Sequence, residues 1–206
     1  SVGKFTQDES TEFHTPYNPS DQREVSRYDT ISSNVITNVA SDYFGCVGIA
    51  AGYPIGLQIT HNVISDLPYT GISLGYGWTD QSNAMRNNVI AYNEVFDVVK
   101  KMNDGSGIYT LSYQPGTKIY RNYIHGISKS EATQQTIVAG IYCDEKSGGS
   151  EEKPMIIEDN IIGYGIPNML KMHQPGIILI KNTIHSVDQG QGKEIVSQIG
   201  LKKRIH

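Results

Sequence analysis

Several residue types are scarce in this 206-residue chain, and each scarcity excludes a class of protein. The only two cysteines, Cys46 and Cys143, sit in separate strand-like segments, which argues against a disulfide scaffold and favours unpaired thiols. The longest apolar runs, such as GIILI, are strand-length, so we expect no membrane span. Long helix-forming windows are missing and leucine is sparse, whereas glycine and tyrosine, at 21 and 13 residues, are plentiful. This composition predicts short strands with many turns.

The chain also has no excess of positive charge. Seventeen Lys and Arg residues stand against 21 Asp and Glu residues, which gives a net charge of −4. The basic run LKKRIH at the end is too short to form a cationic face, so we expect no nucleic-acid partner. The length is sufficient for one domain with a sizeable core.

One internal repeat organises the sequence: an apolar residue, two variable residues, Asn, one variable residue and Ile. The six copies are ISSNVI, ITHNVI, MRNNVI, IYRNYI, IEDNII and LIKNTI, which begin at Ile31, Ile59, Met85, Ile119, Ile157 and Leu179. Successive copies are 28, 26, 34, 38 and 22 residues apart. We expect the Asn to tolerate a left-handed bend, and the stacked Asn amides to hydrogen-bond one another along the axis.

A second element, Gly followed by Ile, precedes several copies, at Gly48, Gly71, Gly107 and Gly140. Each repeat therefore offers two or three short strands with alternating apolar positions. A leucine-rich horseshoe would need a leucine pattern that is missing. The repeat length with variable insertions predicts an all-β fold, a right-handed parallel β-helix of about six coils.

The repeat also predicts a division of the chain. Residues 1–30 are expected to form an irregular polar arm, residues 31–190 the β-helix, and residues 191–206 a tail or cap. The two longest steps flank NDGSGIYT, and insertions in a solenoid become loops that often carry function. Because an open solenoid end must be capped or paired, we expect a missing N-terminal region, a second subunit or a homo-oligomer to cover it.

Two carboxylates are the candidate catalytic residues. Asp104 precedes Gly107–Tyr109 and Asp144 follows Gly140–Tyr142, and these two matching segments should stack in adjacent coils. With coils about 4.8 Å apart and residues about 3.3 Å apart, the two carboxylates are expected from ~5 to more than ~10 Å apart. This range includes the separations that glycosidases use. From spacing alone, Asp104 is either a turn residue or half of an active site.

Side chains suited to sugars surround the two acids. The candidate substrate-binding residues are Tyr76, Trp78, Tyr109, Gln114, Tyr142, Glu145 and His173. Trp78 is either a stacking platform for a sugar ring or a packing residue, and the tyrosines either contact the sugar or form outer solenoid surface. Glu145 is a third acid, a Ca²⁺ ligand or a loop charge. No dense set of oxygen ligands surrounds it, so we expect no metal and no cofactor.

Three other histidines are expected to be structural. His61, His125 and His185 all lie in or just after the Asn repeat, on its turn side. His173, in LKMHQPG, lies one coil after Asp144 and is the one histidine expected near the site.

The sequence resembles a known group at MRNNVIAYNEVFDVVKKMNDGSGIYTLSYQPGTKIYRNYIHGI and GIYCDEKSGG. It is similar to bacterial right-handed β-helix proteins allied to glycoside hydrolase family 141, which includes α-L-fucosidases and xylanases. The similarity runs from about Gly71 to Asn182. It implies that Asp104 and Asp144 are the catalytic pair, with a retaining course slightly favoured. Family enzymes are usually longer, which implies that this chain is part of a larger enzyme.

The sequence therefore predicts an extracytoplasmic glycosidase, periplasmic, at the cell surface or secreted, that acts on a polysaccharide or oligosaccharide. Two alternatives remain open. A polysaccharide lyase or epimerase would need a base and a cation for a uronate, and Lys100, Lys101 and Lys171 are available. A non-catalytic carbohydrate-binding β-helix would need neither. Fold alone does not choose among them, because function lies in the loops.

Overall fold

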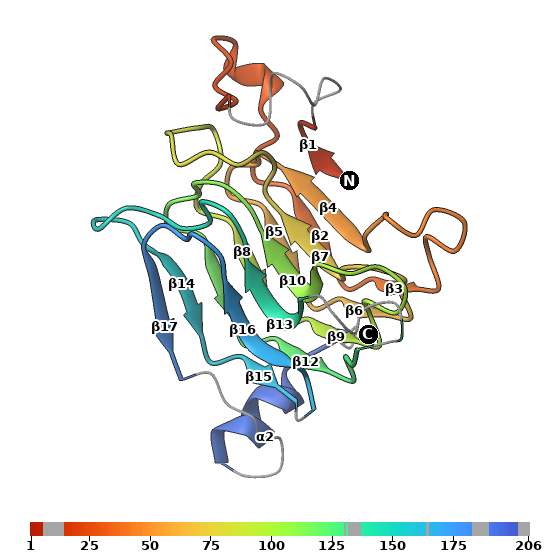
Figure 1. The fold of residues 1–206 in the computed structure, drawn as a ribbon. Coiled ribbons are helices and arrows are strands. Elements are labelled where there is room, and N and C mark those ends of the chain that lie inside the picture. Colours follow the sequence, from red (N-terminus) through yellow and green to blue (C-terminus); the bar gives the residue numbers. More distant parts are fainter. Residues whose placement is uncertain (6–14, 130, 132–136, 164, 183–189, 202–206) are drawn as a thin grey trace, which may run out of the picture.

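The computed structural model describes residues 1–5, 15–129, 131, 137–163, 165–182 and 190–201. Three parallel sheets make up the body (Figure 1). We call the one that carries the Gly-Ile elements sheet 1. In hydrogen-bonded order its strands are β1 (Val2–Gly3), β4 (Ile49–Gly52), β7 (Ile72–Leu74), β10 (Gly105–Thr110), β13 (Val138–Cys143) and β16 (Asn168–Met172).

The other two sheets carry the two halves of the Asn repeat. Sheet 2 contains β2 (Thr30–Ser32), β5 (Gln58–Thr60), β8 (Val89–Ala91), β11 (Lys118–Tyr120), β14 (Met155–Glu158) and β17 (Ile178–Lys181). Sheet 3 contains β3 (Val35–Thr37), β6 (Val63–Ser65), β9 (Glu94–Phe96), β12 (Tyr123–His125) and β15 (Ile161–Ile162).

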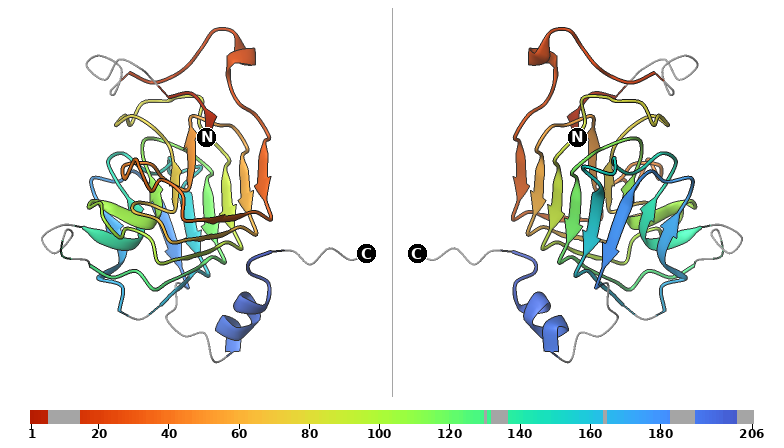
Figure 2. Two further views of the ribbon diagram at one scale, coloured as in Figure 1. Left: turned by 90° about the vertical axis from the view of Figure 1, so that its right-hand side faces the viewer. Right: turned by 90° about the vertical axis from the view of Figure 1, so that its left-hand side faces the viewer.

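Each coil passes through sheet 2, sheet 3 and sheet 1 in turn, and the next coil pairs with it in parallel. The side views show the strands of neighbouring coils stacked in sequence order (Figure 2). The helical segments described are a 3-10 turn at Gln22–Glu24 and α2 (Gly190–Ser197). The predicted fold, a right-handed parallel β-helix, is confirmed.

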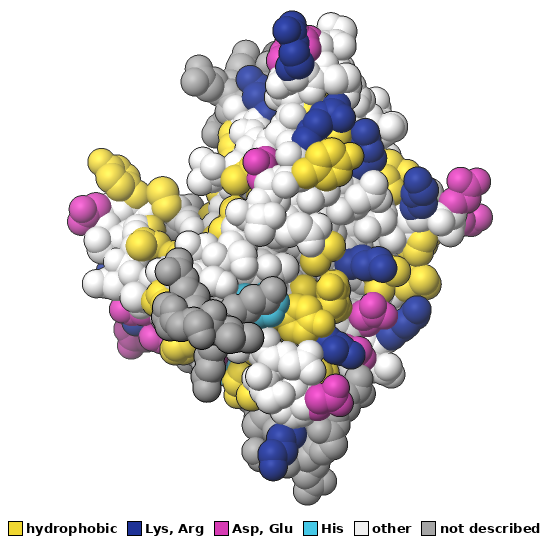
Figure 3. Space-filling model, turned by 180° about the vertical axis from the view of Figure 1, so that it is seen from behind, with side chains coloured by type: hydrophobic (Ala, Val, Ile, Leu, Met, Phe, Trp, Pro, Cys, Tyr) yellow, Lys and Arg dark blue, Asp and Glu magenta, His cyan; other side chains and the backbone are white. Residues whose placement is uncertain are grey.

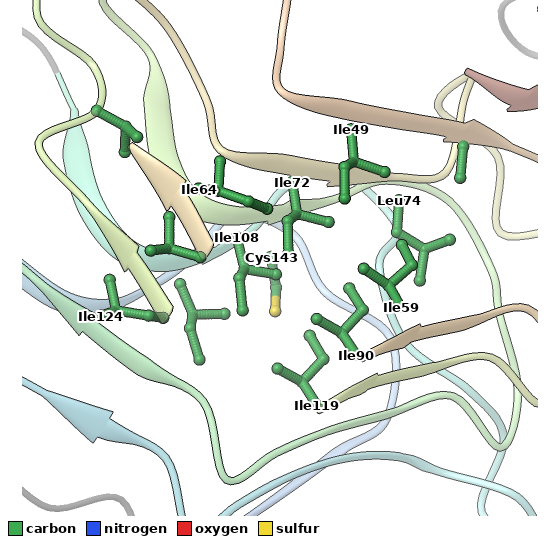
Figure 4. Close-up of a cluster of buried hydrophobic side chains, with 14 of the residues drawn as sticks. Ile49, Ile59, Ile64, Ile72, Leu74, Ile90, Ile108, Ile119, Ile124 and Cys143 are labelled. Atoms are coloured by element: carbon green, nitrogen blue, oxygen red, sulfur yellow. The ribbon is translucent and has the colours of Figure 1, made fainter. Parts of the chain in front are cut away.

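Columns of identical residues form the core. Ile31, Ile59, Ile90, Ile119 and Ile157 are consecutive register partners in sheet 2. Ile49, Ile72, Ile108 and Ile141 form the matching column in sheet 1, so the predicted stacking of the Gly-Ile elements is confirmed. Figure 4 shows side chains from the three sheets pointing into one interior. A single coil has no partner for these apolar side chains, so the stack as a whole stabilises each coil.

The stacked Asn amides form the predicted ladder. The Asn93 Oδ1 accepts hydrogen bonds from the backbone N of Asn62 at 3.0 Å and from its Nδ2 at 2.9 Å. Asn122 accepts the same pair of bonds from Asn93. Asn34 and Asn160 continue the ladder at its two ends.

The left-handed residue at this bend is not the Asn, and that prediction is wrong. His61, Tyr92 and Arg121 each precede a ladder Asn and have φ angles of +58°, +57° and +51°. The chain turns at these residues because the Asn side chain must stay inside to bond the next coil. The variable residue before each Asn therefore bears the unusual backbone conformation.

The predicted repeat is also out of register in two copies. Ile59 pairs with Ile90, so Asn93 and not Asn88 belongs to the ladder. Asn88 instead accepts a hydrogen bond from the Leu57 backbone N at 2.9 Å, at another corner of the coil. In the last copy Ile157 pairs with Ile180, so Asn182 falls at the left-handed position, with φ +46°. By register the steps are 28, 31, 29, 38 and 23 residues, so one long insertion remains where two were predicted.

Segments near both ends of the chain form hydrogen bonds with the coils. Val2–Gly3, within the predicted polar arm, forms β1 and pairs with β4. Near the other end Gly200 donates its backbone N–H to the Tyr92 carbonyl at 3.0 Å. The division into arm, solenoid and tail stays a prediction. Within the described part of the chain, no helix has the length and apolar character needed to cross a membrane.

Candidate functional site

Asp104 and Asp144 lie at opposite ends of two paired strands. Asp104 immediately precedes β10, and Asp144 immediately follows β13 on the next coil. The strands pair Tyr109 with Tyr142 and Thr110 with Cys143. Asp104 has a φ angle of +55°, and its carbonyl oxygen accepts a hydrogen bond of 3.0 Å from the Tyr69 hydroxyl.

A column of glycines shapes the sheet between the two acids. A Cβ at Gly107 would lie 2.6 Å from the Ile124 Cγ2, inside the solenoid, and one at Gly140 would lie 2.7 Å from the Ile162 Cγ2. Ile108, the next residue, also points inward and is fully buried. Two successive inward positions interrupt the regular alternation of β10 at Gly107, and no side chain fits at that position.

One pocket of about 660 Å³ contains both acids. It is lined by Tyr69, Trp78, Asp104, Tyr109, Ile137, Tyr142, Asp144, Glu145, Lys171 and His173. Seven of the nine predicted site residues are among them. Sequence reasoning did not single out Tyr69 and Ile137, which lie in the loops that enter β7 and β13 and carry no motif. It considered Lys171 only as a cation for a lyase.

Asp144 is buried and held by donors. It is 6% exposed. One carboxylate oxygen accepts a hydrogen bond from the Tyr109 hydroxyl, and the other lies 2.9 Å from the His173 Nδ1. The register explains the second contact, because Cys143 pairs with Met172 and places His173 beside Asp144. The Glu145 Oε1 lies 4.0 Å from the same ring nitrogen.

Asp104 is more exposed than Asp144. Partial desolvation and then the negative charge of Asp144 raise its pKa above the ordinary 3.8, against smaller lowering effects of Tyr142 and His173. Interactions with both carboxyl groups, after burial, raise the pKa of the Tyr142 hydroxyl. Asp104 and Asp144, at opposite ends of the paired strands β10 and β13, thus face one pocket.

The tyrosines of the pocket remain protonated donors. Burial first, and then the neighbouring carboxylates, raise the pKa values of Tyr69, Tyr109 and Tyr142 above the ordinary 10.0. Each hydroxyl therefore keeps its proton at neutral pH.

Two predicted substrate-binding residues lie outside the pocket. Gln114 is fully buried, and its Nε2 donates to the Leu111 carbonyl at 3.0 Å. Tyr76 packs against the core, with its ring 5.4 Å from that of Phe5. It stands between two glycines with positive φ, Gly75 and Gly77, and this turn directs Trp78, two residues later, into the pocket.

Two other histidines stack on aromatic rings. His125 stacks on Phe96 and Tyr123 at 4.9 and 4.1 Å, and His61 stacks on Tyr92 at 5.0 Å. His185 lies outside the described residues.

Within the described residues, no group of three or more His, Cys, Asp or Glu side chains is placed to hold a metal ion. In the view from behind, basic and acidic side chains are interspersed (Figure 3).

Two comparisons with known proteins give matches. A family model described as "Periplasmic copper-binding protein (NosD)" matches residues 23–142, more than half of the chain. A solved structure called "Glycoside hydrolase" is 35% identical, with a TM-score of 0.78. That match covers 92% of this chain and 30% of the other, so the chain spans about three-tenths of that protein's length. A search of curated proteins found no match.

Proposed function

The chain belongs to the NosD family, and we propose that it is the catalytic part of a glycoside hydrolase that acts on a polysaccharide or oligosaccharide. One observation carries this proposal: Asp104, whose pKa is raised, and the buried carboxyl group of Asp144 face one pocket. The similarity to a structure called "Glycoside hydrolase" supports it.

The roles of the two acids follow from their surroundings. The raised pKa of Asp104 favours its protonated form, which makes it the general acid that protonates the leaving glycosidic oxygen. Asp144 is the carboxylate, stabilised by Tyr109 and His173, that attacks the sugar or activates a water molecule.

The rest of the pocket provides the sugar contacts. Trp78 offers an aromatic face, and Tyr69 offers a ring and a donor. Glu145 and Lys171 supply polar groups at the mouth. The finer proposal is an enzyme of the family 141 type, such as an α-L-fucosidase or a xylanase. The family's printed description supports an extracytoplasmic location.

The family's printed description names copper binding. The side chains of this chain do not fit it, because no ligand cluster is formed within the described residues. No step of the proposed reaction therefore involves copper.

The test is turnover of Asp104→Asn and Asp144→Asn on a panel of glycans. Each change should lower kcat by about 10²–10⁴-fold. The control Asp159→Asn, at the opposite bend with φ +53°, should keep wild-type turnover. Wild-type turnover in both site variants would refute the proposal. An unsaturated, ultraviolet-absorbing product would instead identify a lyase, and binding without any product a non-catalytic protein.

A further inference from the structure

A turn after β7 brings Trp78 to the pocket that contains Asp104 and Asp144, which we call the acid pocket. The turn lies directly against the chain that leaves β10 on the next coil. A Cβ at Gly75 would lie 2.1 Å from the Leu111 carbonyl oxygen, so the two backbones touch without any side chain between them. The position of the turn therefore depends on the residues that follow β10.

Ser112, two residues after the end of β10, bonds this turn on both sides of Trp78. Its hydroxyl accepts a hydrogen bond from the Thr79 backbone N at 3.1 Å and donates one to the Tyr76 carbonyl at 2.9 Å. Ser112 is fully buried. A hydroxyl both donates and accepts, so one side chain ties the backbone before Trp78 to the backbone after it.

The backbone around Ser112 also joins the turn to the coil above. The Tyr113 backbone N donates to the Thr79 carbonyl at 2.9 Å, and the Ser112 backbone N donates to the Glu145 carbonyl at 3.1 Å. Glu145 lines the acid pocket. Replacing the Ser112 side chain leaves both of these backbone bonds in place. Such a change therefore loosens the Trp78 turn without removing the link to the segment of the acids.

We propose that Ser112 is a positioning residue for sugar binding, which holds the Trp78 ring ready as a platform for a pyranose ring. A platform that is fixed in advance loses less conformational freedom when the sugar binds. Ser112 acts through Trp78 and does not touch the reacting atoms. This inference rests on the proposed function, because the acid pocket must bind a glycan.

The backbone of Ser112 decides which variant tests this role. Its φ angle is +62°, in the left-handed region that glycine adopts without steric cost. Ser112→Gly therefore removes the hydroxyl and keeps the backbone conformation. Ser33→Gly is the matched control, because Ser33 has a φ angle of +58° and is exposed on the first coil.

The first measurement uses no glycan. Trp78 is the only tryptophan in the chain, so tryptophan fluorescence reports on this turn alone. In Ser112→Gly, acrylamide should quench Trp78 more efficiently and the fluorescence anisotropy should fall. Ser33→Gly should match the wild-type protein in both. Ser112→Cys, which keeps the size of the side chain but has a weaker donor, should show a smaller change.

The second measurement titrates Trp78 emission with cellohexaose, xylohexaose and fucosyllactose in the Asp104→Asn background, in which turnover is expected to be slow. Ser112→Gly should weaken binding about threefold to tenfold, the range expected for a lost neutral hydrogen bond. In the active protein the same factor should appear in KM while kcat stays unchanged, because the two acids keep their surroundings.

Several outcomes overturn the inference. Wild-type quenching, anisotropy and affinity in Ser112→Gly would refute the positioning role, as would a fall in kcat with KM unchanged. Trp78 emission that responds to none of the three sugars would refute the platform. Thermal melts confirm that each variant is folded.

Failure of the proposed function gives a different result. If a sugar changes Trp78 emission and its affinity depends on Ser112, yet no glycan is hydrolysed, the proposed function fails while the positioning role stands.

Discussion

The hydroxyl of Tyr109 on β10 donates a hydrogen bond to the carboxylate of Asp144, which follows β13 on the next coil. Register partnership of Tyr109 and Tyr142 places this hydroxyl over the end of the neighbouring strand. The bond joins two coils across the floor of the acid pocket, and it stabilises the ionised form of a buried acid.

Tyr109→Phe should therefore lower kcat about tenfold to a hundredfold, since a hydrogen bond to a charged group contributes about 1.5–3 kcal/mol. Steady-state kinetics on the best glycan substrate checks this. Tyr28→Phe removes an exposed hydroxyl on the first coil and should not change kcat. Equal kinetics for the two variants would show that the bond to Asp144 has no role in turnover.

Asp104 predicts a dependence on pH for both activity and stability. Its pKa is raised in the folded protein, so folding favours its protonated form. The stability that Asp104 contributes is fully present below pH 3.8, its ordinary pKa. That stability is lost as the pH rises through the raised pKa of the folded state. Activity should fall over the same alkaline limb, because the general acid loses its proton.

Asp104→Asn tests the stability part. The variant should melt at a higher temperature than wild type at pH 7, and the difference should vanish near pH 3. Asp159→Asn should melt lower at pH 7, because it removes the partner 3.6 Å from the Arg121 guanidinium. A lower melting temperature for Asp104→Asn at pH 7 would contradict the raised pKa.

Asn93 should be critical for stability. Its replacement by Ala removes four hydrogen bonds, to Asn62, Asn122 and the Ile59 carbonyl, and leaves their buried groups unpaired. We expect a loss of about 3 kcal/mol in the free energy of unfolding, measured in urea. Asn34→Ala, at the exposed end of the ladder, should cost about 1 kcal/mol or less. Similar losses at both positions would argue against a cooperative ladder.

Gly107→Ala should destabilise the protein by about 1–3 kcal/mol, the cost of overpacking. The new Cβ would meet the Ile124 Cγ2 at 2.6 Å and the Gly140 carbonyl oxygen at 2.9 Å. Gly45→Ala is the matched control, since no atom lies within 4 Å of its Cβ position. Chemical denaturation of both variants checks the difference, and a neutral Gly107→Ala would show that the interior at this position tolerates a side chain.

The two thiols should differ in reactivity. Cys46 is exposed, whereas burial raises the pKa of Cys143 to about 12. A disulfide reagent at pH 8 should label one thiol in the native protein and a second only after unfolding. Rapid labelling of two native thiols would contradict the burial of Cys143.

The sequence by itself determined the coil and its core. Apolar residues such as Ile59 and Ile119 recur with Asn at a fixed distance, because each coil needs the next to bury its side chains and pair its amides. The Gly-Ile pattern likewise predicted that Asp104 and Asp144 lie at the ends of stacked strands. It misplaced the third copy, because Asn88 and Asn93 follow similar patterns and only pairing between coils distinguishes them.

Tertiary structure alone decided which side chains share the pocket. Tyr69 and Ile137 reach it from loops whose path depends on the neighbouring coils, and no local pattern marks them. Gln114 and Tyr76 follow strands that line the site, yet the chain turns after those strands, which buries Gln114 and packs Tyr76 against the core. The two acids share the pocket because β10 and β13 pair in register across two coils, a relation that neither coil's sequence specifies.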